Sequence, residues 1–505
     1  MCKELSELTR DLQCDIIGTL EHKICSIVYD SRKVTEGALF VCIRGAVSDA
    51  HQYIVPAIQS GAKVIFVQKD QTVFTKKELQ EMSEAYGVSF VISENTRLAL
   101  AHISATYYDH PDSKMTLLGV TGTKGKTTTT YMIHKILTCA HVRAGLIGTV
   151  SNILDGKTSP ASRTTPESID LWGILKNMAE VKTQTCVMEV SSLGLAFGRV
   201  AGCTFKVAGF TNLFHDHISD IEHKDMDEYL DAKLKIFDQA ENAVINADTD
   251  VSDQVVAYAK KRCKTFLYGL SEDCDCRADN IERVTVNGIT GSKFNLVSPW
   301  YKGDIFVALP GDFNVYNALC AISTASLMGV SFEAIKEGLA QVMVPGRLQM
   351  VPNDKNITVL VDYAHNAASL ETILKTLRHY TDGRLITVFG CGGNRSKTRR
   401  FEMGEVSGVY SDLSIITSDN PRNEEPQAII EDILIGINRT DGQYWVEPDR
   451  TTAITQAVDN AHAGDIIVIA GKGHETYQIF ADRTIHYDDL EVARDVINKI
   501  EAKRE

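Results

Sequence analysis

The chain has 505 residues, of which 44% are hydrophobic and 23% are charged, and its formal net charge at pH 7 is −14. This composition is ordinary for a globular protein, and the length suggests about three domains. The acidic balance argues against a nucleic-acid or anionic-membrane partner, because both require a basic surface. No apolar stretch reaches the roughly 18 residues of a membrane helix. The N-terminus lacks a signal-peptide core, so we expect a cytoplasmic protein, and a monomer.

Strand-like runs alternate with helical patterns along the chain, which is typical of α/β architecture with parallel sheets. The first part contains four short β-rich runs, ICSIVYDSR, ALFVCIRG, KVIFVQ and VSFVIS, followed by a helix over 96–108. Pro111 and its polar neighbours then interrupt the pattern. We therefore expect a smaller N-terminal α/β domain over residues 1–112.

A second series of strands begins at Met115, and we expect a central domain over 113–343 built on a P-loop ATPase-like parallel sheet. Its predicted strands are 115–120, 143–150, 183–190, 205–213 and 242–248, and it closes with a helix over 313–329. Pro345 and Gly346 mark the next boundary. The runs TVLVDYAH, RLITVFG, DLSIITSD and DIIVIAG follow, each before a helical pattern, which predicts a doubly wound, Rossmann-like domain over 344–505.

The twelve cysteines are scattered, and most lie inside apolar runs. We expect them to be small buried hydrophobic residues. Cys274 and Cys276 lack a second ligand pair at zinc spacing, so we expect a loop there and no metal site.

The stretch GVTGTKGKTTTT, Gly119–Thr130, follows an apolar run and precedes a helical pattern. Gly122 and Gly125 allow backbone amides to approach a phosphate chain, and the following helix directs its positive end at the same anion. Lys126 and Thr127 occupy the positions of the P-loop lysine and of the hydroxyl that binds Mg²⁺. The standard motif requires a glycine where this chain has Val120, so we predict a variant nucleotide loop. The alternative is an ordinary glycine-rich turn.

Two further strands end in residues that suit a magnesium site. Glu189 ends the apolar run TCVMEV, and Asp216 and His217 follow the run FKVAGF. A buried carboxylate is costly without a partner, and carboxyl ends of parallel strands share one edge of a sheet. We expect these side chains near the phosphate loop; the alternative is a salt bridge or a hydrogen-bonded loop residue.

Motifs along nearly the whole chain resemble the Mur ligase family, whose members are ATP-dependent amino-acid ligases of bacterial cell-wall synthesis. The matching motifs, in order, are TGTKGKTTT, TTPES, MEVSS, FTNLFHDH, DAKLKIF, PGDFNVYNA, PGR, VDYAH and GKGHE. The chain is most similar to the branch that adds the third residue to UDP-N-acetylmuramoyl-L-alanyl-D-glutamate. In that family the loop reads GTxGKT and does not require the earlier glycine.

The resemblance implies ATP and Mg²⁺ as cofactors and an acyl phosphate on the D-glutamate γ-carboxylate, which an amine then attacks. The implied catalytic residues are Lys126, Lys233 and His217, and the implied metal ligands are Thr127, Glu189, His217 and Lys233. Lys233 matches a lysine that the family carbamylates; without the motif it would be a solvated surface lysine. The implied ATP-binding residues are Gly122, Thr123, Lys124, Gly125, Lys126, Thr127, Thr128, Asn314, Asn317, Arg347, Asp362 and His365. For the asparagine pair, helix capping and solvent exposure is the alternative.

The resemblance also implies the residues that bind the UDP-sugar donor. They are Ser31, Gly45 and Ala46 in the N-terminal domain, and Thr164, Thr165, Ser191 and Arg199 in the central domain.

The acceptor can be argued from the loops that follow three C-terminal strands, since open parallel sheets bind ligands at their carboxyl ends. Arg395 and Arg422 supply planar forks suited to carboxylates, and Glu475 can hold an ammonium group. This set fits a diamino acid with an extra carboxylate. The sequence DNPR is similar to the family's meso-diaminopimelate signature, so we expect meso-diaminopimelate, with lysine or another diamino acid as the alternative. The acceptor residues are Arg395, Asp419, Asn420, Pro421, Arg422, Gly471 and Glu475.

Other interpretations stay open at this point. The arginines could instead form surface ion pairs with Glu424 or Glu425. The chain departs from the family pattern at Leu193, at Phe197, in the loop ISDIEHK and at NAASLE, where the family commonly has histidine, glutamine, LDYHG and TPDSLE. A sibling ligase, such as a folyl-polyglutamate-type enzyme, or a nucleotide-dependent binding protein without ligase activity are the competing hypotheses.

Overall fold

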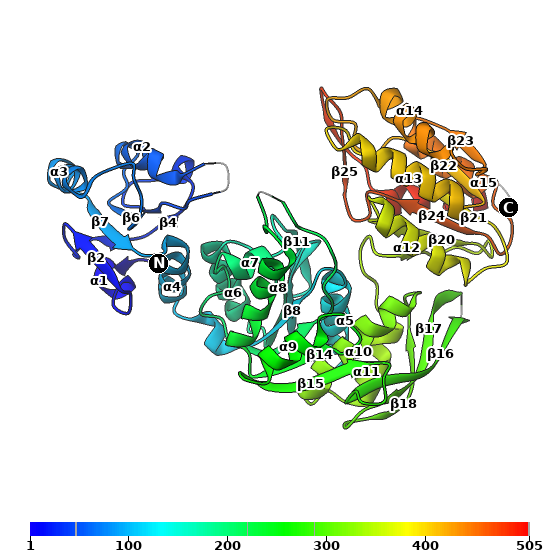
Figure 1. The fold of residues 1–505 in the computed structure, drawn as a ribbon, viewed down its shortest axis with the longest axis horizontal. Coiled ribbons are helices and arrows are strands. Elements are labelled where there is room, and N and C mark those ends of the chain that lie inside the picture. Colours follow the sequence, from blue (N-terminus) through cyan, green and yellow to red (C-terminus); the bar gives the residue numbers. More distant parts are fainter. Residues whose placement is uncertain (46–47, 220, 287, 503–505) are drawn as a thin grey trace. The chain divides into compact units, whose positions relative to one another are not determined.

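The computed structural model describes residues 1–45, 48–219, 221–286 and 288–502. Its contacts divide the chain into two compact units, Met1–Tyr268 with Ser323–Gly329, and Gly269–Ile322 with Val330–Glu505. Each unit combines helices with sheets that are largely parallel (Figure 1), which confirms the α/β prediction. Among the described helices, none is long and apolar enough to cross a membrane.

The first unit begins with a five-stranded sheet in the order β2-β7-β6-β5-β4. These strands are Cys14–Ile17, Ser89–Ser93, Val64–Gln68, Leu39–Val41 and Ile27–Val28, and only β2 runs antiparallel to its neighbour. Alternate residues face opposite sides: Leu39 packs with α4 (Thr96–Tyr107), whereas Phe40 packs with α2 (Ile54–Gln59) and α3 (Lys76–Tyr86). The predicted run ICSIVYDSR forms only two short strands, β3 (Lys23–Ile24) and β4.

The second sheet of this unit carries the phosphate loop. Its strands lie in the order β11-β10-β9-β12-β8-β13-β14-β15. They are Lys157–Pro160, Ser151–Leu154, Ala144–Ile147, Thr185–Glu189, Thr116–Thr121, Phe205–Phe210, Asn242–Asn246 and Lys264–Gly269. All pairings from β9 to β15 are parallel, and β10 and β11 form an antiparallel hairpin. Because helices cover both faces, the parallel strands read as continuous apolar runs, which is why the sequence predicted them.

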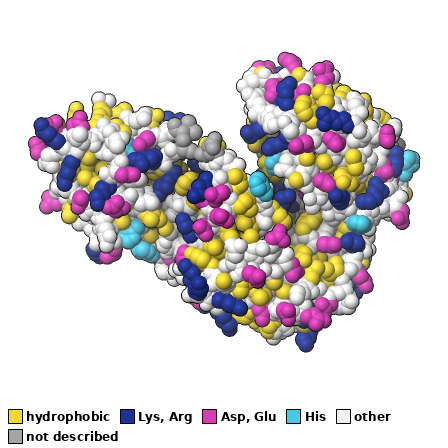
Figure 2. Space-filling view, in the orientation of Figure 1, with side chains coloured by type: hydrophobic (Ala, Val, Ile, Leu, Met, Phe, Trp, Pro, Cys, Tyr) yellow, Lys and Arg dark blue, Asp and Glu magenta, His cyan; other side chains and the backbone are white. Residues whose placement is uncertain are grey.

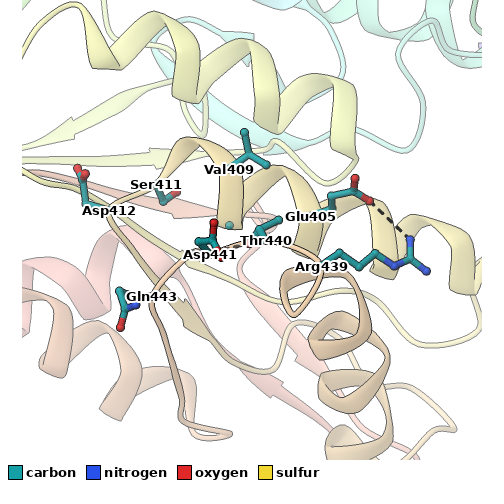
Figure 3. A pocket seen from close by; sticks show the side chains of 10 residues that line it. Glu405, Val409, Ser411, Asp412, Arg439, Thr440, Asp441 and Gln443 are labelled. Carbon is teal, nitrogen blue, oxygen red and sulfur yellow. Dashed lines mark hydrogen bonds and ion pairs between the residues drawn. The ribbon is translucent and has the colours of Figure 1, made fainter.

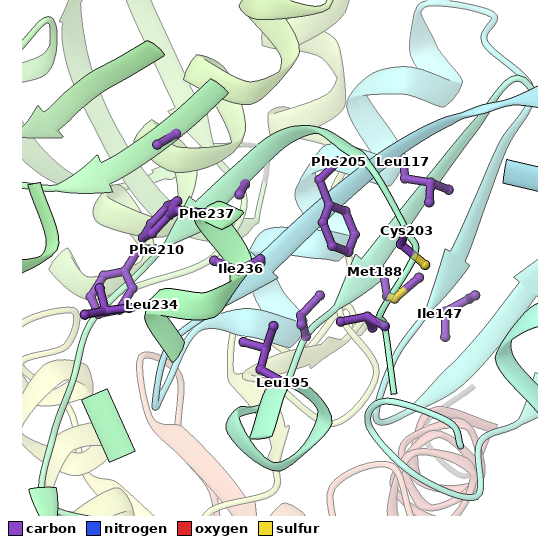
Figure 4. Close-up of a cluster of buried hydrophobic side chains, with 14 of the residues drawn as sticks. Leu117, Ile147, Met188, Leu195, Cys203, Phe205, Phe210, Leu234, Ile236 and Phe237 are labelled. Carbon is purple, nitrogen blue, oxygen red and sulfur yellow. The ribbon is translucent and has the colours of Figure 1, made fainter. Parts of the chain in front are cut away.

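A buried cluster stabilises this sheet (Figure 4). It joins strand residues such as Leu117, Met188 and Phe205 to side chains of the helices that follow the strands, including Leu195 of α7 (Ser192–Ala196) and Leu234 of α8 (Met226–Leu234). Helices α5 (Lys126–Cys139) and α6 (Ser168–Glu180) bury most of their apolar residues as well.

The second unit starts with an antiparallel meander of β16 (Cys276–Val286), β17 (Ile289–Val297) and β18 (Lys302–Val307). Helices α10 (Asp312–Leu327) and α11 (Phe332–Ala340) follow it in the chain. The sequence analysis did not predict these strands, and it placed Cys276 in a loop, whereas Cys276 begins β16.

The C-terminal sheet has the order β19-β20-β24-β21-β22-β23. Its strands are Gln349–Val351, Thr358–Asp362, Ile466–Ala470, Leu385–Phe389, Leu413–Ile416 and Tyr444–Val446. One hydrophobic core lies between the first face of this sheet and the helices α12 (Ala367–Arg378), α13 (Lys397–Tyr410) and α14 (Pro426–Ile437). A second core lies between the second face and the helices α15 (Arg450–Asp459) and α16 (Asp489–Ala502). Helices therefore cover both faces, as the predicted doubly wound domain requires.

One fully buried ion pair lies on the second face of this sheet. Arg450 contacts Asp489 at 2.7 Å, and both side chains have 0% exposure. Arg450 also donates to the carbonyl oxygens of Ser418 and Ala470, at 3.3 and 3.0 Å. It thereby joins the carboxyl ends of β22 and β24.

The cysteines divide into two groups. Seven of the ten free thiols are buried, in agreement with the hydrophobic interpretation. Cys2 and Cys25 instead form a disulfide, which the sequence analysis missed. On the face shown in Figure 2, basic and acidic side chains are interspersed over the surface.

Candidate active site

The phosphate loop connects β8 to α5. Gly122 has φ of 144°, and a Cβ there would lie 1.9 Å from Thr211 Oγ1, so only glycine fits. Gly125 precedes α5 with φ of 86°. Lys126 Nζ donates to the carbonyls of Gly122 and Thr123 at 2.7 and 3.0 Å. Thr127 and Thr128 are buried in the first turn of α5.

The end of β13 fixes the shape of this loop. Asn212 accepts from Thr123 N through its backbone carbonyl, at 3.0 Å, and from Lys124 N through its side chain, at 2.9 Å. Thr211 Oγ1 donates to Lys124 O at 2.7 Å. The Lys124 side chain is exposed. Thr211 and Asn212 therefore fix the backbone of the loop at Thr123 and Lys124.

Gly119 is a packing residue within β8. A Cβ at this position would approach Phe205 Cδ1 at 2.9 Å and Ile236 Cδ1 at 3.2 Å. Gly119, which lies one position before the glycine of the standard motif, therefore allows β8 to pack closely against Phe205 and Ile236. It is not part of the phosphate loop.

Glu189 lies at the carboxyl end of β12, beside β8, and is fully buried. Its carboxylate accepts hydrogen bonds at 2.9 Å from Thr127 Oγ1, from Thr149 Oγ1 and from Thr149 N. Three donors compensate the buried charge. The structure brings Thr127 and Glu189 together, as the sequence predicted.

Lys233 is buried in α8, with 1% exposure. Its Nζ donates to Gly122 O at 2.8 Å and lies 4.4 Å from the centre of the Tyr229 ring. Burial, reinforced by the positive charge of Lys126, holds the pKa of Lys233 well below its usual value, and Asp216 opposes this effect. The solvated-lysine alternative is therefore wrong.

Tyr229 links the other groups of the site. Its hydroxyl donates to Thr123 Oγ1 at 3.1 Å, and its ring lies 5.7 Å from that of His217. His217 has φ of 58°, is 42% exposed, and contacts Glu222 through Nδ1 at 3.1 Å. A partner on Nδ1 orients the ring and leaves Nε2 for a ligand. His217 is thus connected to the phosphate loop through Tyr229.

These residues fit magnesium. A hydroxyl and a carboxylate lie side by side at Thr127 and Glu189, and Mg²⁺ prefers oxygen ligands. The described residues contain no group of three or more His, Cys, Asp or Glu side chains that could hold a metal alone. Mg²⁺ usually keeps water and substrate phosphate ligands beside one or two carboxylates, so a full protein cage is not required.

Four of the predicted donor residues gather near Glu189. Thr165 Oγ1 donates to Glu189 O at 3.0 Å and accepts from Ser191 N at 2.9 Å. Thr164 shares a hydrogen bond with Thr149 at 2.9 Å, and Arg199 donates to Thr165 O at 3.2 Å.

The N-terminal donor residues are less connected. Ser31 begins a 3₁₀ turn, Ser31–Lys33, and Gly45 N donates to Ser48 O at 2.9 Å. Ala46 lies outside the described residues. In the part of the chain that the structure describes, no hydrogen bond joins Ser31 or Gly45 to the other donor residues.

The second unit contains the other predicted nucleotide residues. Asn314 and Asn317 are buried and joined by a hydrogen bond of 3.0 Å, so the solvent-exposed alternative is wrong. Asp362 accepts from Leu348 N and Ala364 N at 2.7 Å, and burial raises its pKa.

An aromatic group lies beside Asp362. The Arg347 guanidinium lies 4.7 Å from the centre of the Tyr363 ring, and the rings of His365 and His474 lie 4.6 and 4.9 Å from it. Burial lowers the pKa values of both histidines, that of His474 to about 4. Uncharged rings beside one arginine suit a flat, electron-rich ligand.

Most predicted acceptor residues form one network at the ends of β22 and β24. Asn420 donates to Glu475 at 2.8 Å and accepts from Lys472 Nζ at 3.3 Å. Asp419 lies against Gly471, where a Cβ would approach its carboxylate at 2.7 Å. Glu475 thus has a fixed position.

The arginine residues of the acceptor group are held differently. Arg422 has φ of 55° and donates from Nη1 to Gly393 O at 2.8 Å, beside the buried Pro421. Arg395 is exposed. Glu424 pairs with Arg400 at 2.7 Å, so the alternative that pairs Glu424 with Arg395 or Arg422 is wrong.

A surface cavity of about 550 Å³ lies elsewhere in the C-terminal domain (Figure 3). Ten residues around the end of α13 and the loop 439–443 line it, and Glu405 pairs across it with Arg439 at 3.6 Å. None of the ten is a predicted site residue, and we assign it no role in the site.

Thr149, Asn212 and Tyr229 were missed by the sequence analysis. Thr149 and Asn212 follow strands β9 and β13, and polar residues directly after a buried strand are a usable signal. Tyr229 gave no such signal, since its role depends on contacts with residues up to 106 positions away.

Three family models match the chain: the catalytic domain of the Mur ligase family over residues 23–108, the Mur ligase middle domain over 120–325 and the Mur ligase glutamate ligase domain over 346–473. A UDP-N-acetylmuramoyl-L-alanyl-D-glutamate–2,6-diaminopimelate ligase from Clostridium botulinum is 42% identical over 98% of this chain and 100% of its own length. The ligase of the same name from Alkaliphilus metalliredigens is 43% identical over 95% of each chain. A solved structure of a ligase of that name superposes with a TM-score of 0.71 at 27% identity, covering 99% of this chain and 100% of the other. The chain belongs to the Mur ligase family.

Proposed function

We propose that the protein is an ATP-dependent ligase that adds meso-diaminopimelate to the D-glutamate γ-carboxylate of UDP-N-acetylmuramoyl-L-alanyl-D-glutamate. The observation that carries this proposal is the full-length similarity to ligases with this name, at 42% identity. The arrangement of the phosphate loop, Glu189 and Lys233 supports it, because these groups suit phosphoryl transfer from ATP to a carboxylate. We also infer a cytosolic location, because the reaction consumes ATP.

The chemistry proceeds in two steps. A γ-carboxylate oxygen attacks the γ-phosphorus of ATP, the bond to the bridging oxygen breaks, and ADP leaves. The amine of diaminopimelate then attacks the acyl carbon, phosphate leaves, and the amine loses one proton. Such steps depend mainly on alignment and on compensation of charge.

The residues of the first unit divide this work. We assign Lys126 and the loop residues 122–128 to the phosphates, and Thr127, Glu189 and His217 to the metal. Mg²⁺, when bound, supplies compensation for the negative charge of the transferred phosphoryl group. Tyr229 orients His217 and the loop through Thr123. Thr164, Thr165, Ser191 and Arg199 are assigned to the donor, together with Ser31, Gly45 and Ala46.

Lys233 is assigned as a carbamate. Its amine is buried beside the phosphate loop, where a cation is poorly placed and where an anion would face Lys126. Loss of one proton from the ammonium group gives the neutral amine, which burial favours. Its reaction with CO₂ forms a C–N bond and releases a second proton, so that a carboxylate-like metal ligand replaces the cation.

The second unit is assigned to the nucleotide and the acceptor. Asn314, Asn317, Arg347, Asp362 and His365 are proposed nucleotide contacts. For the acceptor, Arg422 and Arg395 are proposed to bind the distal carboxylate, and Glu475 the distal ammonium group. The Asn420 and Lys472 contacts support this role of Glu475, because they fix its carboxylate.

The test is a phosphate-release assay with Mg²⁺-ATP and UDP-N-acetylmuramoyl-L-alanyl-D-glutamate, run with meso-diaminopimelate, with L-lysine or without an amine, and with product masses measured. Release with diaminopimelate alone, and a product of matching mass, is expected. Release with lysine would retain the ligase and overturn the acceptor. No release with any amine would overturn the donor and direct attention to Leu193 and Phe197.

A further inference from the structure

A buried carboxylate collects three arginines in the first unit. Glu167, with 7% side-chain exposure, precedes helix α6. It contacts Arg199 at 2.9 Å, Arg97 at 3.6 Å and Arg163 at 3.8 Å. Arg97 comes from the first turn of α4, far away in the sequence, so the cluster joins the N-terminal sheet region to the central one.

The positive charges of this cluster exceed the negative ones. Asp170, the next carboxylate along α6, accepts from Tyr29 at 2.8 Å. Asp170 and Arg163 are exposed, so the less exposed part of the cluster pairs two arginines, Arg97 and Arg199, with one carboxylate, Glu167. The side chain of Arg199 is 8% exposed and that of Arg97 is 18% exposed. A buried charge without full compensation is costly, so the arrangement favours an additional anion.

Two guanidinium nitrogens also lack a hydrogen bond, although one of them, Arg97 Nη1, lies 3.6 Å from Glu167 Oε2. Arg199 Nε and Arg97 Nη1 are buried and have no hydrogen-bond partner among the residues that the structure describes. Buried polar groups are normally hydrogen-bonded, and an exception requires an explanation. A ligand oxygen that accepts from these nitrogens would supply one.

The cluster lies between the two groups of predicted donor residues. Arg97 Nη2 donates to Arg44 O at 3.3 Å, directly before Gly45. Arg199 Nη1 donates to Thr165 O at 3.2 Å. The cluster therefore connects the N-terminal loop with the strand-end threonine.

Phe197 forms a flat surface for both arginines. The Arg97 guanidinium lies 4.3 Å from the centre of its ring and that of Arg199 lies 5.6 Å away. An aromatic ring attracts a guanidinium and fixes its plane. Phe197 thus restricts the planes of both forks.

We propose that Arg97 is a further donor-binding residue, whose guanidinium binds an oxyanion of the UDP-linked donor together with Arg199, while Glu167 positions both forks. This inference rests on the proposed function for the identity of the donor. An arginine fork matches the geometry of a phosphate and of a carboxylate equally well. The donor carries both, as its diphosphate and as its glutamate carboxylates.

The test is isothermal titration calorimetry of Arg97→Gln with UDP, with UDP-N-acetylmuramoyl-L-alanine and with UDP-N-acetylmuramoyl-L-alanyl-D-glutamate. We expect the dissociation constant of the full donor to rise roughly tenfold to thirtyfold, as for loss of one charged interface contact, with ATP binding unchanged. Arg97→Lys should recover part of the affinity. Arg262→Gln, which removes an exposed arginine of the same unit, is the matched control.

The three ligands distinguish the source of the oxyanion. An equal loss with UDP and with the full donor identifies the diphosphate. A loss only with the dipeptide donor identifies the glutamate carboxylate. Both results support the inference.

Two results would overturn it. One is wild-type affinity of Arg97→Gln for all three ligands. The other result comes from a double variant. If Arg97 only neutralises Glu167, then the variant that carries both Glu167→Gln and Arg97→Gln should bind the donor with the same affinity as Glu167→Gln alone. If the wild-type protein binds none of the three ligands, the proposed function itself is overturned. If wild type and Arg97→Gln bind equally well, only the inference about Arg97 is overturned.

Discussion

The side-chain nitrogens of Lys126 and Lys233 both donate a hydrogen bond to the carbonyl oxygen of Gly122, at 2.7 and 2.8 Å. Two ammonium groups at one carbonyl repel each other, and burial strengthens the repulsion. Conversion of Lys233 into an anion would replace this repulsion by attraction to Lys126. The geometry therefore disfavours two adjacent cations and is compatible with the proposed carbamate.

Lys233→Ala tests this relationship. Loss of one preorganised charged group commonly lowers kcat by about 10²–10³, so we expect turnover to fall at least about 100-fold. Added formate or acetate should restore part of the activity by occupying the vacated space as an anion. Phosphate release is the measurement, and Lys235→Ala, at an exposed position two residues later, is the control. Unchanged turnover in Lys233→Ala would remove the carbamate from the mechanism.

Arg422→Ala tests the acceptor. Removing one partner of a hydrogen-bonded charge pair costs about 2 kcal/mol or more, so KM for diaminopimelate should rise roughly 30-fold or more. KM for ATP should stay within about twofold of wild type, since this side chain contacts Gly393 rather than a proposed nucleotide residue. Arg439→Ala, an exposed arginine in the same unit, serves as control. Equal increases in both KM values would contradict the assignment.

Gly148→Ala tests the position of Glu189. A Cβ at residue 148 would lie 2.3 Å from Glu189 Oε1, so the carboxylate must shift from the position in which its other oxygen accepts from Thr127. We expect a lower kcat and a higher Mg²⁺ concentration for half-maximal rate, measured by titrating Mg²⁺ at saturating substrates. Gly173→Ala, where the nearest atom lies at 3.3 Å, should behave as wild type. An unchanged Mg²⁺ requirement in Gly148→Ala would argue against Glu189 as a ligand.

His474 should make stability depend on pH. Burial lowers its pKa from 6.5 to about 4, so between these values the unfolded chain binds a proton that the folded chain does not. Its contribution to stability is fully present above pH 6.5 and falls as the pH approaches 4, by at most roughly 3 kcal/mol. Thermal unfolding midpoints at pH 7 and pH 5 should differ less in His474→Gln than in wild type. His379→Gln, at an exposed position, is the control and should show the same difference between the two midpoints as wild type. If His474→Gln also showed the wild-type difference, the interpretation would be wrong.

The fold was predictable where strands are buried on both faces. The apolar run that forms β12 is buried at every residue, and such runs bounded by polar residues are distinctive. Strand β16 was missed because most of its residues are partly or fully exposed and polar residues dominate its sequence. The Cys2–Cys25 disulfide was missed because a pair of cysteines in a long chain carries no spacing signal.

Site residues that lie within a recognisable sequence motif were predictable. Site residues whose role depends on a contact with a distant part of the chain were not. Thr127 was expected in the phosphate loop and Glu189 at a strand end, and they meet. Asn212 shapes the phosphate loop from 88 positions away; its place after β13 marks it as a polar residue at a strand end, but it does not indicate which loop Asn212 contacts. The individual binding roles of the site residues stay predictions.

The buried pair of Arg450 and Asp489 has a consequence for genetics. Asp489 begins the last helix, α16, while Arg450 joins the ends of β22 and β24, from which DNPR and GKGHE emerge. A premature stop codon after codon 475 and before codon 489 would remove Asp489 together with α16, so Arg450 would lose its partner and the core on this face would lose Ala493, Val496 and Ile497. Such late nonsense alleles should therefore fail to complement a strain that lacks this gene, although every proposed substrate contact is still encoded.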